Sequence, residues 1–166
     1  MVCRGRYALA VSVLACLAVG DHLLLPASPA PEALDALRGR GRLVLHDGGE
    51  AGGLDVLARD GEAAPLDLRG VREEAILAVL TTSGSTGGAV EWPKSVRQLL
   101  GEARTLASAF GVAGEDRLLV TVPSVHIYGL LFGVLLPLVV GAAFSDDTPL
   151  FPAAVDARIE RSRATM

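Results

Sequence analysis

Hydrophobic residues along the chain form short runs that alternate with amphipathic stretches. In residues 95–110 the apolar side chains recur at intervals of three and four, which is typical of a helix with one buried face. Residues 75–80 are apolar without a break, as a strand buried on both faces requires. Strands that alternate with helices predict an α/β fold with a mostly parallel sheet. The whole pattern predicts helices over 6–19, 31–39, 95–110, after the turn at 123–126 and from residue 152 onward, and strands over 23–25, 43–45, 75–80 and 118–122.

Several of these elements carry residues that start or stop them. Ser95 can cap the helix at 95–110 and Gly111 can end it. Pro137 should kink or end the helix that follows residue 126, because proline removes a backbone donor. Residues 51–69 are rich in glycine and aspartate without a clear period, so we expect an irregular surface segment there.

The composition narrows the class of protein. Hydrophobic residues make up 51% of the 166 residues, which excludes a disordered chain, since such a chain needs low hydrophobicity and high net charge. The formal net charge is -4 and the 15 Lys and Arg residues form no block, so no nucleic-acid partner is expected. Two cysteines, Cys3 and Cys16, are too few for a disulfide framework and fit a reducing compartment. The carboxylates of Asp146 and Asp147 are expected to be solvated in a turn.

Two apolar stretches leave a membrane role open. Residues 6–20 imitate a secretory signal, although Asp21 and His22 stand where a cleavage site should be; a buried first helix is the alternative. Residues 118–144 carry no Asp, Glu, Lys or Arg, and a run of that length is a candidate membrane-spanning helix. Prolines and glycines interrupt the run, and a buried strand, turn and helix would give the same pattern.

The segment that carries chemistry directly follows the apolar strand. Residues 81–88, Thr-Thr-Ser-Gly-Ser-Thr-Gly-Gly, combine hydroxyl side chains with three glycines. Glycines allow successive backbone N–H groups to turn toward an anion, and hydroxyls add donors without bulk. The spacing does not match the Walker nucleotide-binding loop, which needs a second glycine followed by lysine. A flexible linker is the alternative, but its place directly after a buried strand favours a phosphate-binding loop.

Two segments in this order resemble the motifs of one enzyme family. Residues 80–87, Leu-Thr-Thr-Ser-Gly-Ser-Thr-Gly, resemble the phosphate loop of the adenylate-forming (AMP-binding) enzymes, which include acyl-CoA synthetases and luciferases. Residues 122–130, Val-Pro-Ser-Val-His-Ile-Tyr-Gly-Leu, are similar to the acyl-pocket motif of the same family. The resemblance covers most of the chain and is weakest over 51–69. It favours the buried alternative for both apolar stretches, 6–20 and 118–144.

The resemblance implies a fold, a reaction and partners. It implies that residues 1–166 form an incomplete N-terminal AMP-binding domain of an acyl-CoA synthetase-type ligase, with the C-terminal domain absent. Such an enzyme uses ATP and Mg²⁺ to activate a fatty or aryl carboxylic acid as the acyl-adenylate. It then passes the acyl group to CoA or to a phosphopantetheinyl carrier protein. The implied location is cytoplasmic, with no membrane partner.

The resemblance also assigns the site residues. His126 is placed at the mouth of the acyl pocket as the candidate catalytic residue, with a core histidine as the alternative. Tyr128 and Gly129 are placed in the pocket wall, and no metal ligand is assigned. Phosphate binding is assigned to Thr82, Ser83, Gly84, Ser85, Thr86 and Gly87.

The chain departs from the family pattern in two respects. Gly88, Ala89 and Val90 stand where Pro-Lys-Gly usually follows the loop, so the usual lysine is missing. No segment matches the family's residues for adenine, ribose or magnesium, or its transferring lysine, so the chain alone is expected to be inactive. A non-catalytic membrane-anchored protein and a truncated remnant without activity stay open as alternatives.

Overall fold

The computed structural model describes residues 1–26, 30–48, 53–58, 65–83 and 89–166. The helices are α1 (Arg6–Val19), α2 (Pro31–Gly39), α3 (Val96–Phe110), α4 (Ile127–Leu130), the π-helical turn η1 (Leu131–Leu135), α5 (Leu136–Val140) and α6 (Pro152–Ser162). The strands are β1 (Leu23–Leu25), β2 (Leu45–His46), β3 (Leu54–Asp55), β4 (Ile76–Ser83), β5 (Ala89–Ser95), β6 (Arg117–Leu118) and β7 (Ala143–Phe144).

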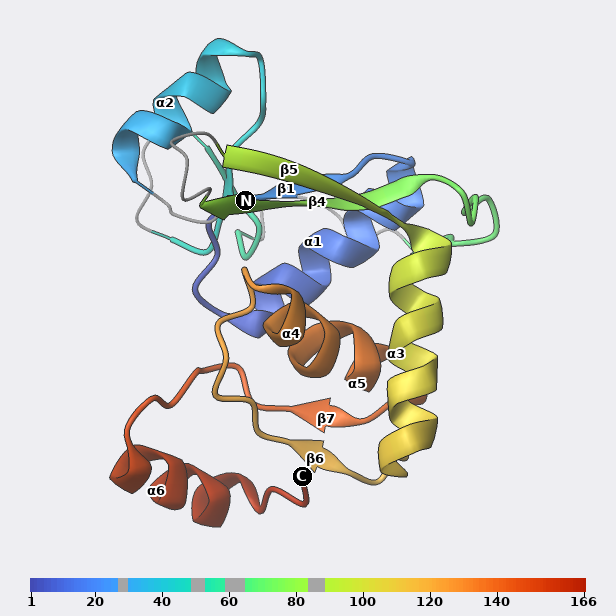
Figure 1. Ribbon diagram of the computed structural model, residues 1–166, viewed down its shortest axis with the longest axis vertical. Coiled ribbons are helices and arrows are strands. Elements are labelled where there is room, and N and C mark those ends of the chain that lie inside the picture. The colour runs from blue at the N-terminus through green and yellow to red at the C-terminus, as the bar shows by residue number, and fades with distance from the viewer. Residues whose placement is uncertain (27–29, 49–52, 59–64, 84–88) are drawn as a thin grey trace.

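These elements lie in successive layers, which Figure 1 shows from top to bottom. Helix α2 is uppermost, and the sheet β1-β4-β5 lies below it, with β1 parallel and β5 antiparallel to the central strand β4. Helices α1 and α3 and the run α4–α5 lie beneath it (Figure 1). The parallel pair β6-β7 and then α6 follow below, while β2 and β3 form a separate parallel pair. The fold is therefore mixed α/β with mostly parallel strand pairs, which confirms the predicted class.

Two of the predicted helices have ends that the sequence specifies locally. Helix α3 begins with a capping box, in which the Ser95 hydroxyl accepts from the Gln98 N–H and the Gln98 side chain accepts from the Ser95 N–H. Gly111 ends it with φ 67°, a left-handed conformation that glycine adopts without steric cost. Gly20 ends α1 in the same way with φ 72°.

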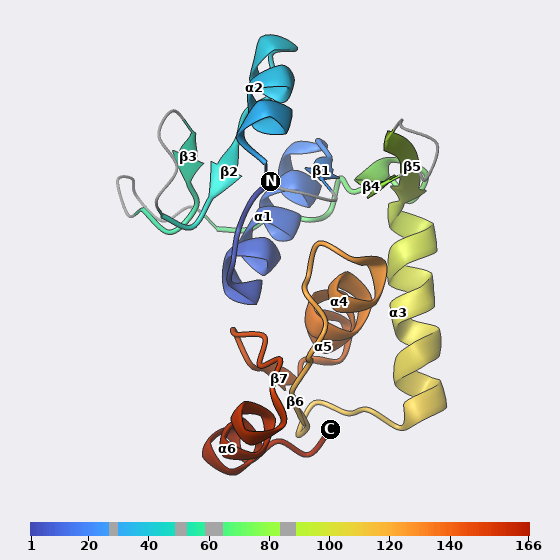
Figure 2. The ribbon, with the colours of Figure 1, turned by 60° about the vertical axis from the view of Figure 1, so that its left-hand side comes forward.

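The uncharged stretch 118–144 is folded into the core. It supplies β6, the turn before α4, the helical run 127–140 and β7. The π-helical turn η1 lies between α1 and α3 and contacts both, as Figures 1 and 2 show from two sides. Its side chains Leu131, Val134 and Leu135 are fully buried. Burial of a large apolar side chain stabilises the folded state by about 1.5–3 kcal/mol. Among the described residues, no helix is long and apolar enough to cross a membrane.

Four predicted elements differ in detail from the structure. Strand β2 begins two residues later than predicted, and β3 pairs with it inside the segment expected to be irregular. Strand β5 was not predicted, and the predicted strand at 118–122 ends at Leu118. The helical run continues past Pro137 to Val140, so Pro137 does not end it. The preceding turn η1 is π-helical instead, and such a turn removes the crowding of the proline ring against the carbonyl four residues earlier.

Candidate functional site

The residues that flank the predicted phosphate loop belong to two paired strands. Strands β4 and β5 pair antiparallel up to Ser83 and Ala89, which face each other in the ladder. Residues 84–88 lie outside the described residues, as do the side chains of Thr82 and Ser83. The hairpin therefore holds the two ends of the predicted loop side by side, directly above the helical layer (Figure 1).

The second predicted motif forms the tight turn that opens α4. His126 is the N-cap residue of this helix, with extended backbone at φ -90° and ψ 151°. Its N–H donates to the Pro123 carbonyl at 3.1 Å, and its own carbonyl accepts from the Leu130 N–H at 2.9 Å. The His126 side chain is exposed, so it is not a core histidine. The turn thus fixes the His126 backbone and leaves the imidazole free to face a ligand.

Gly129 permits this turn because no side chain would fit there. A Cβ on Gly129 would lie 2.1 Å from the Pro123 carbonyl oxygen and 2.8 Å from the Val122 carbonyl oxygen. Gly129 is buried, whereas the Tyr128 side chain is 66% exposed. The structure therefore gives Gly129 a defined role in the turn and places Tyr128 at the surface beside it.

Two polar groups near this turn had not been singled out from the sequence. The Ser124 hydroxyl is buried and has no hydrogen-bond partner among the described residues. The Arg6 side chain, on α1, is completely buried and donates to the carbonyls of Val120 and Val122, which lead into the turn. A serine in an apolar run and an arginine at a helix start have no sequence signal that marks them as buried.

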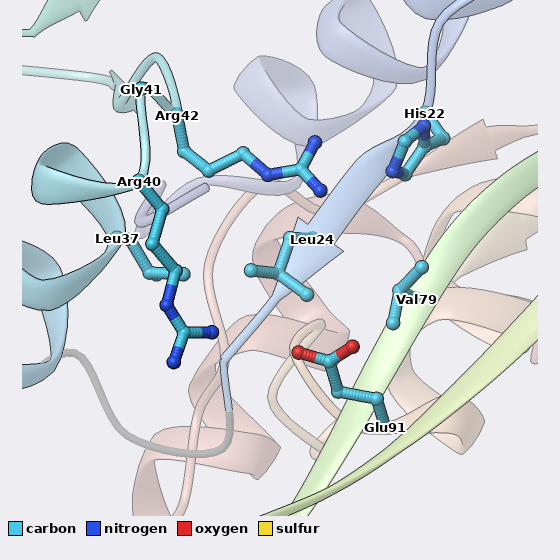
Figure 3. A pocket seen from close by; sticks show the side chains of 8 residues that line it. All are labelled: His22, Leu24, Leu37, Arg40, Gly41, Arg42, Val79 and Glu91. Carbon is cyan, nitrogen blue, oxygen red and sulfur yellow. The ribbon is translucent and has the colours of Figure 1, made fainter.

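A cavity of about 310 Å³ is lined by residues of β1, β4 and β5 and by the end of α2 with the residues that follow it. Figure 3 shows the guanidinium groups of Arg40 and Arg42 and the carboxylate of Glu91 pointing into it over Leu24 and Val79. The side chains of Arg40 and Arg42 form no ion pair within the described part of the chain. They can attract an anionic group, and none of the predicted site residues lines this cavity.

The carboxylates of Asp146 and Asp147 do more than face solvent. Asp146 Oδ1 accepts from the Tyr7 N–H at 2.7 Å and so caps the amino end of α1, whose own N-cap Gly5 offers no side chain. Asp147 pairs with Arg158 of α6. The prediction that both are merely solvated is therefore incomplete, because a cap supplied from a distant segment leaves no local sequence pattern.

Comparison with known proteins identifies the family. A sequence profile described as AMP-binding enzyme matches residues 5–166. The chain is 39% identical over 90 residues to a 4-coumarate–CoA ligase of Rhodobacter capsulatus, an alignment covering 53% of this chain and 23% of the relative. It is 34% identical over 98 residues to a 4-coumarate–CoA ligase of Halorhodospira halophila, covering 59% and 24%. The chain thus spans about a quarter of the length of these relatives.

Solved structures give the same result for the fold. The O-succinylbenzoate–CoA synthetase of Bacillus subtilis in complex with AMP superimposes with a TM-score of 0.80 at 22% identity, over 99% of this chain and 46% of that one. A malonyl-CoA ligase with methylmalonyl-CoA and AMP bound superimposes with a TM-score of 0.70 at 28% identity, over 95% and 36%. The match of the family profile to nearly the whole chain settles the assignment, and the chain belongs to the AMP-binding enzyme family of adenylate-forming ligases.

Proposed function

We propose that this chain supplies the phosphate loop and part of the acid pocket of an AMP-forming acid–thiol ligase. The observation that carries the proposal is the placement of the described residues that flank the two motifs. Strands β4 and β5 pair up to Ser83 and Ala89, on either side of the predicted loop, and the turn 123–126 opens α4 in the helical layer beneath the same sheet (Figure 1). We further propose that residues 1–166 correspond to an N-terminal part of an AMP-binding domain, which is supported by the share of the solved structures that this chain covers.

In the proposed reaction, a carboxylate oxygen of the acid bonds to the α-phosphorus of ATP as the bond to pyrophosphate breaks. Thr82, Ser83, Gly84, Ser85, Thr86 and Gly87 hold the β- and γ-phosphates through hydroxyl and backbone donors. Hydrogen bonds to a charged group contribute about 1.5–3 kcal/mol each, so a few converging donors suffice. Magnesium, when bound, neutralises phosphate charge. The described residues offer no cluster of three acidic, His or Cys side chains, so we place no metal ligand among them.

His126 is proposed to lie at the mouth of the acid pocket, with Tyr128 and Gly129 forming its wall. The exposed imidazole on a backbone fixed by two hydrogen bonds supports this role. The proposed acid is a fatty or aryl carboxylic acid, and the acyl group passes to the thiol of CoA or of a carrier protein's phosphopantetheine. The choice of an aryl acid and of CoA is supported by the names of two relatives, which are 4-coumarate–CoA ligases. We propose a cytoplasmic location, supported by two unpaired cysteines.

The chain by itself is proposed to be inactive. Positioning of two substrates lowers the activation free energy of such a reaction by about 7–11 kcal/mol in favourable cases. That positioning needs residues for adenine, ribose and the transferring lysine, which no segment of this sequence matches. The short share of each relative that this chain covers supports the proposal.

A chimaera tests the function. The chain replaces its matched segment in the Rhodobacter capsulatus ligase, and ATP–pyrophosphate exchange is measured over a panel of fatty and aryl acids. We expect acid-dependent exchange that is lost in the Gly84→Val chimaera and retained in the Gly101→Ala chimaera, since Gly101 lies in α3 with open space around it. Undiminished exchange with Gly84→Val, or a folded chimaera without exchange, would contradict the proposal.

A further inference from the structure

Arg6 is a buried cation held almost entirely by backbone carbonyls. Its side chain is completely inaccessible to solvent. Its Nη1 donates to the carbonyls of Ser145, at 3.1 Å, and Asp147. Its Nη2 donates to Val120 and Val122, at 2.5 and 3.1 Å, and to the Thr148 hydroxyl at 3.0 Å. One guanidinium thus joins α1 to two segments more than 110 residues away along the chain.

This arrangement costs free energy that an ordinary structural contact would avoid. None of the ion pairs within the described residues includes Arg6, so its charge is balanced by carbonyl dipoles. Burial lowers the pKa of the guanidinium, while the nearby carboxylates of Asp147 and Asp146 raise it. Its Nε is buried without a partner among the described residues. An apolar side chain at this position would avoid that cost, but it would leave the carbonyls of Val120 and Val122 without the donor that holds them.

The carbonyls that Arg6 holds belong to the segment that shapes the candidate site. Residues 119–122 form no strand, although their β-branched sequence predicts one, and two of their four carbonyls accept from Arg6 instead. The next residue, Pro123, accepts the His126 N–H and lies against Gly129. Arg6 is therefore connected to the His126 backbone by two hydrogen bonds. The first joins Arg6 to the Val122 carbonyl, and the second joins the carbonyl of the next residue, Pro123, to the His126 N–H.

Gly133 reserves the space for this guanidinium from the opposite side. A Cβ on Gly133 would lie 2.6 Å from Arg6 Nε and 3.0 Å from Arg6 Cδ. Gly133 is buried in η1, the π-helical turn that follows α4. Arg6 is thus enclosed between the segment before His126 and the helical turn after it.

We propose that Arg6 is a positioning residue for His126, acting through the carbonyls of Val120 and Val122. The catalytic importance of this inference rests on the proposed function, which places His126 at the mouth of the acid pocket. It requires no ligand to be tested. Without the guanidinium, the segment 119–126 loses its donors, and the His126 turn samples other conformations while the sheet β1-β4-β5 keeps its pairing.

The test compares Arg6→Lys and Arg6→Ala in the full chain. Lysine keeps the charge but presents one ammonium, which cannot reach five acceptors arranged for a planar fork. We expect hydrogen-exchange protection of the His126 and Leu130 amides to fall about tenfold or more in both variants, with protection in β4 unchanged. Arg97→Ala is the control, since Arg97 is exposed and forms ion pairs with Glu73 and Glu74 at the surface.

A second readout reports on the imidazole itself. The described residues hold all three histidines of the sequence, so the His126 resonances can be followed in NMR spectra with His22 and His46 as internal references. We expect both Arg6 variants to shift the His126 resonances alone. Gly133→Ala should cause the same shift, because its methyl displaces the guanidinium, and should cause little further change when combined with Arg6→Ala.

The outcomes separate the inference from the function on which it rests. Unchanged His126 resonances and amide protection in folded Arg6→Lys would overturn the positioning role. So would an equal loss of protection in β4, or global unfolding of both variants, since either would make Arg6 a general stability residue. Failure of the proposed function would show instead in the acid-dependent exchange of the chimaera, which these measurements do not use.

Discussion

Gly129→Ala tests the turn at the centre of the candidate site. The added methyl would lie 2.1 Å from the Pro123 carbonyl oxygen and 2.5 Å from the Pro123 carbonyl carbon. Both obstructing atoms are backbone, so they cannot rotate away as a flexible side chain would. The turn must open by roughly 1 Å, which weakens the hydrogen bond from His126 N–H to Pro123 O.

The size of the effect follows from two opposing contributions. Overpacking a well-packed site costs about 1–3 kcal/mol, and a backbone obstruction belongs at the upper end of that range. Alanine recovers up to about 1 kcal/mol relative to glycine inside a helix. We therefore expect the free energy of unfolding to fall by about 2 kcal/mol, which lowers the urea midpoint by about 1 M for a slope near 2 kcal/mol/M.

The assay is urea unfolding of the purified chain, followed by circular dichroism and tryptophan fluorescence at Trp92. Gly101→Ala is the matched control, because Gly101 lies within α3 and nothing lies within 4 Å of its added Cβ. This control should be as stable as the parent or up to about 1 kcal/mol more stable. A Gly129→Ala chain with the parent's midpoint and slope would refute the close approach at Pro123.

Three further predictions follow from the described contacts. The pKa of Asp116 is held below its usual range by the Ala113 N–H and then the Thr165 hydroxyl, so its contribution to stability is present above the ordinary Asp pKa and is lost as the pH falls through the lowered value. The protection factor of the Thr165 amide, which corrects for the slower intrinsic exchange in acid, should therefore fall as the pH is lowered, and Asp116→Asn should remove this pH dependence; an unchanged profile would show that the contact is not made. Burial raises the pKa of the Cys3 thiol to about 12 and that of the Cys16 thiol to about 11, so alkylation by iodoacetamide at pH 8 should be roughly a hundredfold slower in the native chain than in urea. Equal rates would mean that both thiols are accessible. Ser95→Ala should lower the free energy of unfolding by about 1 kcal/mol through loss of the capping box, whereas Ser108→Ala, exposed in the same helix, should change it little.

The sequence predicted those helices and strands whose apolar periodicity and end signals lie within one continuous stretch of chain. Helix α3 has its amphipathic face, its Ser95 cap and its Gly111 stop within one stretch, and it forms as predicted. Strand β5 could not be read in this way, because Glu91, Pro93 and Lys94 interrupt its apolar positions. It forms because β4 offers a complete partner strand beside it, and its own outer edge tolerates a proline.

The candidate site depends more on contacts between distant segments. The two motifs were visible as sequence, and so was the turn that opens α4. The reason that β6 ends at Leu118 was not visible, because the following carbonyls accept from Arg6 at the other end of the chain. A carbonyl acceptor has no side-chain identity, so Arg6 leaves no complementary residue in the sequence. For the same reason, a buried arginine could be mistaken for the basic start of a secretory signal.

Titration of the chain with inorganic triphosphate tests the central claim most directly, because this probe needs the phosphate loop and none of the unmatched adenine or ribose residues. In ¹H–¹⁵N NMR spectra, we predict saturable shifts of the backbone amides of residues 82–88, with β1 and α3 unaffected. Gly84→Val should abolish these shifts and Gly101→Ala should keep them. The account would be contradicted if the parent chain showed no shift at these residues, or if the Gly84→Val chain bound the probe equally well.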